Sequence, residues 1–217
     1  MWQTVVAGGW VMLPILLCSA LALAIGIERL WALRRVVVIP PGLVAQIPDL
    51  AAAGELQPTK LQALRNNSAL GRVLAAALGN VQEEWAVKRE HIEEAGRHVV
   101  HDMERYLNTL GTIAAITPLL GLLGTVIGMI KVFAAITASG IGDPQALSGG
   151  ISEALLTTAA GLSVAIPALI LYRYLRGRVD ELVVGMEAEA IHLLEMMSAR
   201  NESRDEARDN GMDNSRA

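Results

Sequence analysis

Three long apolar stretches divide the sequence. Residues 1–27 contain no charged side chain, residues 106–130 contain none, and between 144 and 172 the only charge is Glu153. About 20 mainly apolar residues are enough for a helix to cross the hydrocarbon of a bilayer. The pattern therefore predicts three transmembrane helices. The predicted spans are 7–30, 109–136 and 147–171.

Amphipathic patterns flank the second and third spans. Apolar residues spaced by three, four or seven with charges between them predict a helix with one buried face. In the segment before the second span these residues are Trp85, Ile92, Val99, Met103, Tyr106 and Leu110. After the third span they are Val179, Leu182, Met186, Ala190, Leu193 and Met197. No proline interrupts 83–117, so we expect that helix to run directly into the second span.

The other polar segments contain helix breaks. Pro40, Pro41 and Gly42 end the first helix, and Pro58 marks a short helix–turn–helix pattern. Residues 200–217 have no apolar face and are expected to form a disordered tail. The sequence thus predicts an all-α polytopic membrane protein whose second and third helices extend far into the cytoplasm. The predicted order is a stub at 1–6, the span 7–30, a helical domain at 31–108, the span 109–136, a loop at 137–146, the span 147–171, a helix at 172–199 and the tail at 200–217.

Composition excludes several classes of protein. The chain has 217 residues, of which 53% are hydrophobic and 18% charged, so overall disorder is excluded. A single cysteine, Cys18, excludes a disulfide-built domain, and a net charge of −4 disfavours nucleic-acid binding. We find no nucleophile–base set, phosphate loop or metal-ligand spacing, so neither an enzyme nor a cofactor is expected. His91 and His98 lie seven apart on a charged helix and are expected to face solvent.

Basic residues near the ends of the spans predict the orientation. They are Arg29, Arg34, Arg35, Arg97, Arg105, Arg173, Arg176 and Arg178. All lie in or beside the two large polar segments, which are therefore cytoplasmic, while the N-terminus and the 137–146 loop lie outside. The first span follows a neutral start and precedes its arginines, so we expect a retained helix and not a signal peptide. Lys131 is the one discordant charge, and its long side chain can reach the outer interface.

Small residues occupy one face of the second and third spans. In the second span they are Ala114, Pro118, Gly121, Thr125 and Gly128, and in the third Ala154, Thr158, Gly161, Ala165 and Ala168. Such faces let two helices bring their backbones close together. A tightly packed bundle accounts for all of these residues without indicating a function.

Glu153 is the informative residue within the spans. A charge at the centre of a membrane helix costs about 2.5–3.5 kcal/mol or more. A carboxyl group that is neutral when dry and ionised when wet can take a proton from one side of a membrane and release it to the other. Two structural alternatives are a neutral hydrogen-bonding residue and a static anchor paired with Lys131.

Helix geometry limits which hydroxyl group can share the face of Glu153. Thr157 is four residues further on and lies on the same face. Thr158 is five residues on, which places it about 140° around the helix. We therefore expect Thr158 to lie at the contact with the second span, near Thr125.

Two runs of residues resemble a known family. Residues 113–130 (IAAITPLLGLLGTVIGMI) resemble the second-helix motif of the MotA/TolQ/ExbB proton-channel family, and residues 150–162 (GISEALLTTAAGL) resemble its third-helix motif. The likeness is greatest to the ExbB branch, whose short members also resemble the opening 8–19. By motif match, Glu153 takes the place of the family's channel glutamate, and Thr158 and Thr125 take the places of its two polar channel-lining threonines. Lys131 departs from the neutral residue expected there.

The resemblance implies an assembly and a location. Proteins of this branch form a homo-oligomeric ring, expected to be a pentamer, around the membrane helix of an ExbD-type protein in the bacterial inner membrane. With ExbD and TonB they use the proton-motive force to drive import across the outer membrane, and the N-terminus is then periplasmic. Two alternatives stay open. One is a TolQ-type subunit of the Tol-Pal envelope system, and the other is a passive membrane scaffold for a partner.

Overall fold

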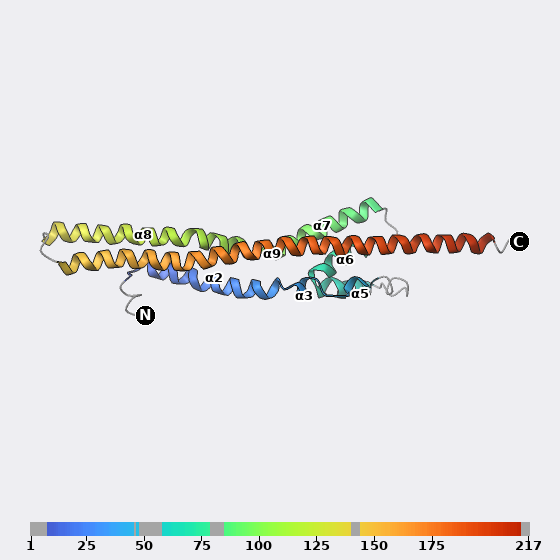
Figure 1. Ribbon diagram of the computed structural model, residues 1–217, viewed down its shortest axis with the longest axis horizontal. Helices are drawn as coiled ribbons and strands as arrows, with labels where there is room; N and C mark the ends of the chain where they lie inside the picture. The colour runs from blue at the N-terminus through green and yellow to red at the C-terminus, as the bar shows by residue number, and fades with distance from the viewer. Residues whose placement is uncertain (1–7, 46, 48–57, 79–84, 140–143, 214–217) are drawn as a thin grey trace. The chain divides into compact units, whose positions relative to one another are not determined.

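The computed structural model describes residues 8–45, 47, 58–78, 85–139 and 144–213, and within these ranges it is helical, with no strand (Figure 1). The helices are α2 (Met12–Ala32), α3 (Arg35–Val38), α5 (Pro58–Asn67), α6 (Ala69–Leu78), α7 (Trp85–Glu104), α8 (Leu107–Ser139) and α9 (Pro144–Asp213). Three stretches, in α2, α8 and α9, are long and apolar enough to cross a membrane. The prediction of an all-α protein with three membrane-crossing helices is confirmed.

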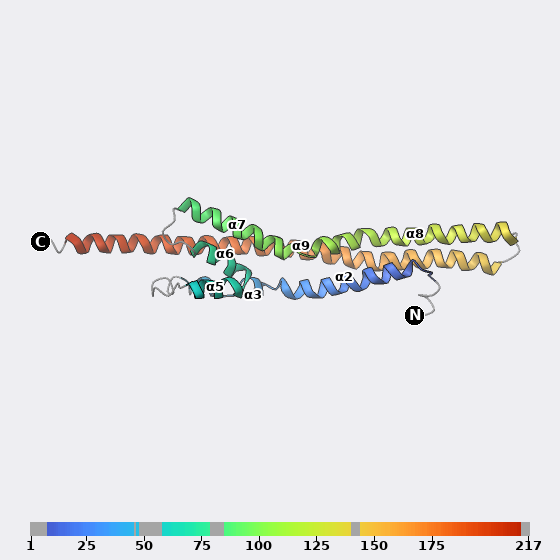
Figure 2. The same cartoon turned by 180° about the vertical axis from the view of Figure 1, so that it is seen from behind.

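The chain divides into two compact units. The first unit contains residues 1–31 and 105–177, and the second contains 32–104 and 178–217. In the first unit α2, α8 and the first part of α9 lie side by side, as both views show (Figures 1 and 2). Val11, Met12 and Ile15 at the start of α2 form a buried cluster against partly buried side chains of α8 and α9. All the predicted membrane spans therefore belong to the first unit.

Small residues bring α8 and α9 into backbone contact. A Cβ atom added at Gly161 would lie 2.8 Å from the carbonyl oxygen of Thr117 and 3.1 Å from the Cα of Gly121. One added at Gly128 would lie 2.7 Å from the carbonyl oxygen of Gly150. No larger side chain fits at these positions without a backbone shift. The predicted close packing of the two small faces is confirmed.

The outward side of the first unit is apolar. Large hydrophobic side chains are more than half exposed on all three spans; they include Leu13, Leu17, Leu119, Leu122, Phe133, Leu155, Ile166 and Ile170. Exposed apolar side chains in this number are unfavourable in water and suit the hydrocarbon of a bilayer.

The second unit is built on α5, α6, α7 and the later part of α9. The sequence predicts a helix–turn–helix near Pro58, and α5 begins at this residue. Ser68 separates α5 from α6, and its Oγ accepts a hydrogen bond from the backbone N–H of Gly71 at 3.0 Å, which caps α6. The stripe predicted below the third span is buried from Val179 to Leu193, whereas the side chain of Met197 lies outside the described residues.

The predicted continuous helix from residue 83 into the second span is wrong at Tyr106. Here α7 ends at Glu104, α8 begins at Leu107, and Tyr106 has a φ of 65°. A positive φ is strained for a bulky residue, so its surroundings must hold it. The guanidinium groups of Arg29 and Arg105 lie 5.2 and 4.9 Å from the centre of its ring. Tyr106 is accordingly exposed instead of lying in the buried stripe.

The structure also differs from the prediction at the C-terminal end. A disordered tail is predicted from residue 200, but α9 continues to Asp213. This segment lacks an apolar stripe, yet it contains no proline and includes several good helix formers, so local propensity favours the helix. Residues 1–7 and 140–143, on which the predicted stub and most of the predicted loop fall, lie outside the described residues.

The contact between α8 and α9 can be tested at Gly161. We expect Gly161→Ala to lower the thermal stability of the purified protein in detergent, by about 1–3 kcal/mol, because the new methyl group meets backbone atoms of α8. Gly177→Ala, on the same helix, is the matched control. Nothing lies within 4 Å of its added Cβ, so the better helix propensity of alanine should preserve or raise stability. Equal thermal shifts for the two variants would contradict the close contact.

Candidate functional site

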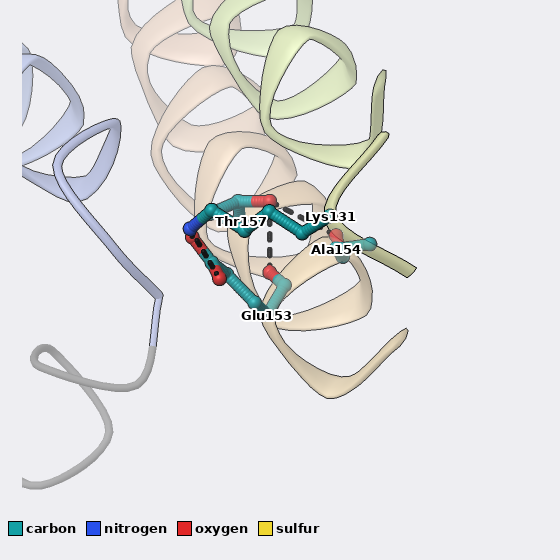
Figure 3. A network of polar contacts seen from close by, with 4 residues as sticks. All are labelled: Lys131, Glu153, Ala154 and Thr157. Carbon is teal, nitrogen blue, oxygen red and sulfur yellow. Dashed lines mark hydrogen bonds and ion pairs between the residues drawn. The ribbon is translucent and has the colours of Figure 1, made fainter. Parts of the chain in front are cut away.

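Glu153 of α9 forms an ion pair with Lys131 of α8 (Figure 3). The Nζ atom of Lys131 donates hydrogen bonds to Oε1 at 2.6 Å and to Oε2 at 2.8 Å. The Glu153 side chain is 15% exposed and that of Lys131 is 52% exposed. Of the alternatives left open by the sequence, the structure has the pair, so the ammonium group lies on the carboxylate instead of extending alone to the interface.

The packing of α8 and α9 sets this pairing. Gly128 and Gly150 contact each other about one turn from the two charged residues, and an added Cβ at Gly150 would lie 3.1 Å from the Gly128 carbonyl oxygen. With the backbones this close, the side chains of Lys131 and Glu153 meet across the contact. The ion pair is therefore a consequence of the register between the two small faces.

Gly9 completes the surroundings of the carboxylate. It has a φ of 69°, and a Cβ atom placed on it would overlap Oε1 of Glu153 and lie 3.0 Å from its Cδ. A non-glycine residue would be strained at this φ and would also displace the carboxylate. Sequence reasoning missed this contact. The only signal was the Gly8–Gly9 pair near the start of the predicted first span, which indicates a turn but not the residue that packs against it.

Thr157 lies one turn after Glu153 on α9 and is fully buried. Its hydroxyl donates to the backbone carbonyl oxygens of Glu153 at 3.1 Å and Ala154 at 2.9 Å (Figure 3). Inside a membrane, a hydroxyl group can fulfil its hydrogen-bonding capacity with carbonyl groups of its own helix in this way. The carboxylate of Glu153 is bonded by Lys131 and not by Thr157. Its side chain packs against Gly124, which explains why that position has no side chain.

Thr158 lies at the contact with α8, as the helix geometry predicts. Its Oγ1 donates to the backbone carbonyl oxygen of Gly121 at 3.1 Å, which is a hydrogen bond between the two spans. Thr125, one turn after Gly121 on α8, donates to the carbonyl oxygen of Leu122 at 2.6 Å. Glu153 and Thr158 therefore bond across the α8–α9 contact, whereas the Thr125 hydroxyl bonds within α8, and neither threonine hydroxyl bonds to Glu153.

The four histidines and the cysteine form no metal site in the part of the chain that the structure describes, where no group of three or more potential ligands occurs. His91 and His98 are exposed on α7, as expected.

Comparison with known proteins identifies the family. The family model described as the MotA/TolQ/ExbB proton channel family matches residues 65–188, which include α8, the ion pair and both threonines. The match covers more than half of the chain, so the protein belongs to this family. Its members are proton-channel and transport components of membranes, not enzymes.

Individual relatives agree with this assignment. A protein of Synechocystis named as an ExbB-like biopolymer transport protein is 37% identical over 171 residues, which cover 77% of this chain and 67% of the relative. The biopolymer transport protein exbB1 of Vibrio cholerae is 32% identical over 162 residues, covering 72% of this chain and 70% of the relative. The Tol-Pal system protein TolQ of Haemophilus influenzae is 38% identical over 81 residues, covering 37% of this chain and 36% of the relative.

The hydrogen bond between the spans can be tested at Thr158. We expect Thr158→Val to destabilise the purified protein by about 0.6 kcal/mol, and by no more than about 1.7, because the Gly121 carbonyl of α8 loses the hydrogen bond that it accepts from α9. Thr137→Val in α8 is the matched control, since the Thr137 hydroxyl donates only to carbonyls of its own helix. Thermal unfolding in one detergent compares the two variants, and a larger loss for Thr137→Val would contradict a stabilising role of the bond.

Proposed function

We propose that this chain is the proton-channel subunit of an inner-membrane complex of the ExbB–ExbD–TonB type, which uses the proton-motive force to energise import across the outer membrane. The observation that carries the proposal is the carboxylate of Glu153. It is the only acidic residue between 144 and 172, and it lies at the contact of two membrane helices within the segment that matches the family.

Glu153 has the chemistry of a proton carrier. As a carboxylate it accepts two hydrogen bonds from Lys131, and as a neutral carboxyl it can reside in an apolar environment without a counter-charge. A proton that enters from the outer side binds to one carboxylate oxygen and leaves toward the inner side after a change in the group's surroundings. Thr158 and Thr125 are proposed as the polar positions that continue this path. The Thr158 hydroxyl lies at the interhelical contact and Thr125 follows Gly121 by one turn on α8, and water or a partner chain can reach such groups when the contact opens.

The proposed assembly is a homo-oligomeric ring, a pentamer, around the helix of a single-span ExbD-type protein. A TonB-type protein is the proposed partner that transmits the energy to the outer membrane. The apolar outer side of the first unit supports contacts with lipid and with neighbouring copies. The proposed orientation places the N-terminus in the periplasm and the C-terminus in the cytoplasm, since the arginines cluster at the corresponding ends of the spans. No cofactor other than the transported proton is proposed.

The first test replaces the carboxyl group. We expect Glu153→Gln to reduce energised uptake to the background level, because an amide has nearly the same shape but cannot carry the proton. The complex should still assemble and purify with its partner. Glu187→Gln, an exposed carboxyl of the second unit, is the matched control and should leave uptake unchanged. Wild-type uptake by Glu153→Gln in a strain lacking any paralogue would overturn the proposed function.

The passive-scaffold alternative makes the opposite prediction at the same residue. If the Lys131–Glu153 pair only joins two helices, then Glu153→Ala should leave the partner stable and uptake intact, and the assembled complex should show no proton flux in liposomes.

A rescue experiment separates the two pathways of the family. ExbB-type names predominate among the similar proteins, and the TolQ of Haemophilus influenzae is also among them, which supports the ExbB type. We expect the gene to restore growth on iron–siderophore in a strain lacking its own ExbB-type subunit. Restoration of detergent resistance in a strain lacking TolQ, without restored growth on siderophore, would instead establish the Tol-Pal alternative.

A further inference from the structure

We propose that Lys131 is a resident counter-ion that holds Glu153 in its ionised form between proton transfers and must leave the carboxylate before a proton can bind. Lys131 is thus a positioning residue, because it acts on the proton only through Glu153. The inference rests on the proposed function of Glu153 as the proton carrier and adds a gate to it.

The geometry favours the ionised carboxylate. One ammonium group donates to both oxygens, at 2.6 and 2.8 Å, which is the arrangement of a charge-assisted pair. A neutral carboxyl would place a hydrogen on one of these oxygens, where it would face another donor. Lys131 and the proton therefore compete for the same two atoms. Between residues 106 and 172 Lys131 is the only basic residue, so no other cation of the second and third spans can take its place.

The two partners differ in their freedom to move. Glu153 is largely buried, and Gly9 packs directly against its carboxylate. Lys131 is about half exposed and carries its charge on a flexible four-carbon chain. When the pair opens, the lysine is therefore the group that leaves. A partly buried carboxylate without its partner is costly, and binding a proton removes that cost.

The cycle balances in atoms and charge. When the pair opens, a proton forms an O–H bond with one oxygen of Glu153, and Lys131 keeps all three of its N–H bonds. When that O–H bond breaks toward the opposite side, the carboxylate is charged again and the lysine returns. One proton crosses, and neither residue is changed.

The Lys131–Glu153 pair is not needed to hold α8 and α9 together. Contacts between Gly161 and Thr117, and between Gly128 and Gly150, already join α8 and α9 through their backbones. The hydrogen bond from Thr158 to Gly121 adds a polar link between the same helices. The costly charges are therefore better explained by control of the carboxylate than by attachment of the helices.

The test measures the protonation of Glu153 directly, with the full-length protein in lipid nanodiscs at one neutral pH. Hydrophobic carbodiimides modify carboxyl groups in their protonated form, and mass spectrometry of the peptide reports the adduct at Glu153. We expect Lys131→Met to be modified at least about tenfold faster than the wild type, because the ionised form has lost two charge-assisted hydrogen bonds. Lys131→Arg should stay close to the wild type, since it restores the charge.

Two controls keep the result interpretable. Lys60→Met, in the second unit, removes a lysine far from Glu153 in the sequence and should not change the rate of modification. Infrared spectroscopy provides a second measurement, because the carbonyl stretch of a protonated carboxyl should appear in Lys131→Met and disappear in Lys131→Met/Glu153→Gln. Lys131→Gln serves in the same way if the methionine variant does not fold.

The outcomes distinguish this inference from the proposed function. Equal modification rates for the wild type, Lys131→Met and Lys131→Gln, with uptake lost in Glu153→Gln, would overturn the counter-ion alone. Faster modification of Lys131→Met, combined with normal uptake by Glu153→Gln, would show that Lys131 keeps Glu153 ionised but would overturn the proposed function and, with it, the gate.

Discussion

In lipid, apolar side chains gain nothing by turning toward a neighbouring helix, so α8 and α9 need another reason to associate. They associate because glycine, alanine and threonine let their backbones touch, with the Thr117 carbonyl against Gly161 and the Gly150 carbonyl near Gly128. Dispersion contacts and the hydrogen bond from Thr158 to the Gly121 carbonyl then replace the missing hydrophobic force. This backbone contact fixes the register of the two helices, and the positions of all the candidate site residues follow from that register.

The register of α8 and α9 also determines where the charges of Lys131 and Glu153 lie in the first unit. Two opposite charges are taken out of water together, and their attraction has to offset the loss of hydration. Lys131 is about half exposed and Glu153 is largely buried, so the loss of hydration is smaller for the lysine than for the glutamate. The charge on Glu153 can be cancelled in two ways, by an ammonium group or by a proton. A carboxylate that can be neutralised in these two ways suits a site that alternates between them.

Local rules predicted much of this architecture from the sequence. The three spans could be predicted from the absence of charge, because this pattern can be recognised without knowledge of tertiary contacts. The rotation of 100° per residue along a helix placed Thr158 at the interhelical contact. The choice between a lone Glu153 and one paired with Lys131 could not be made, because it depends on the distance between two helices. The left-handed backbone conformation of Tyr106 could not be predicted from the sequence either. No glycine or proline marks it, and the arginine that faces it across the unit, Arg29, is far away in the sequence.

The place of Gly9 has a practical consequence for anyone who handles this protein. Gly9 lies just before α2, and its backbone packs against the carboxylate of Glu153. A tag or fluorescent protein joined directly ahead of Gly9 would therefore displace or shield this carboxylate. A fusion placed after Asp213, where α9 ends, is about 60 residues from Glu153 along the chain and is the sounder choice for purification and imaging.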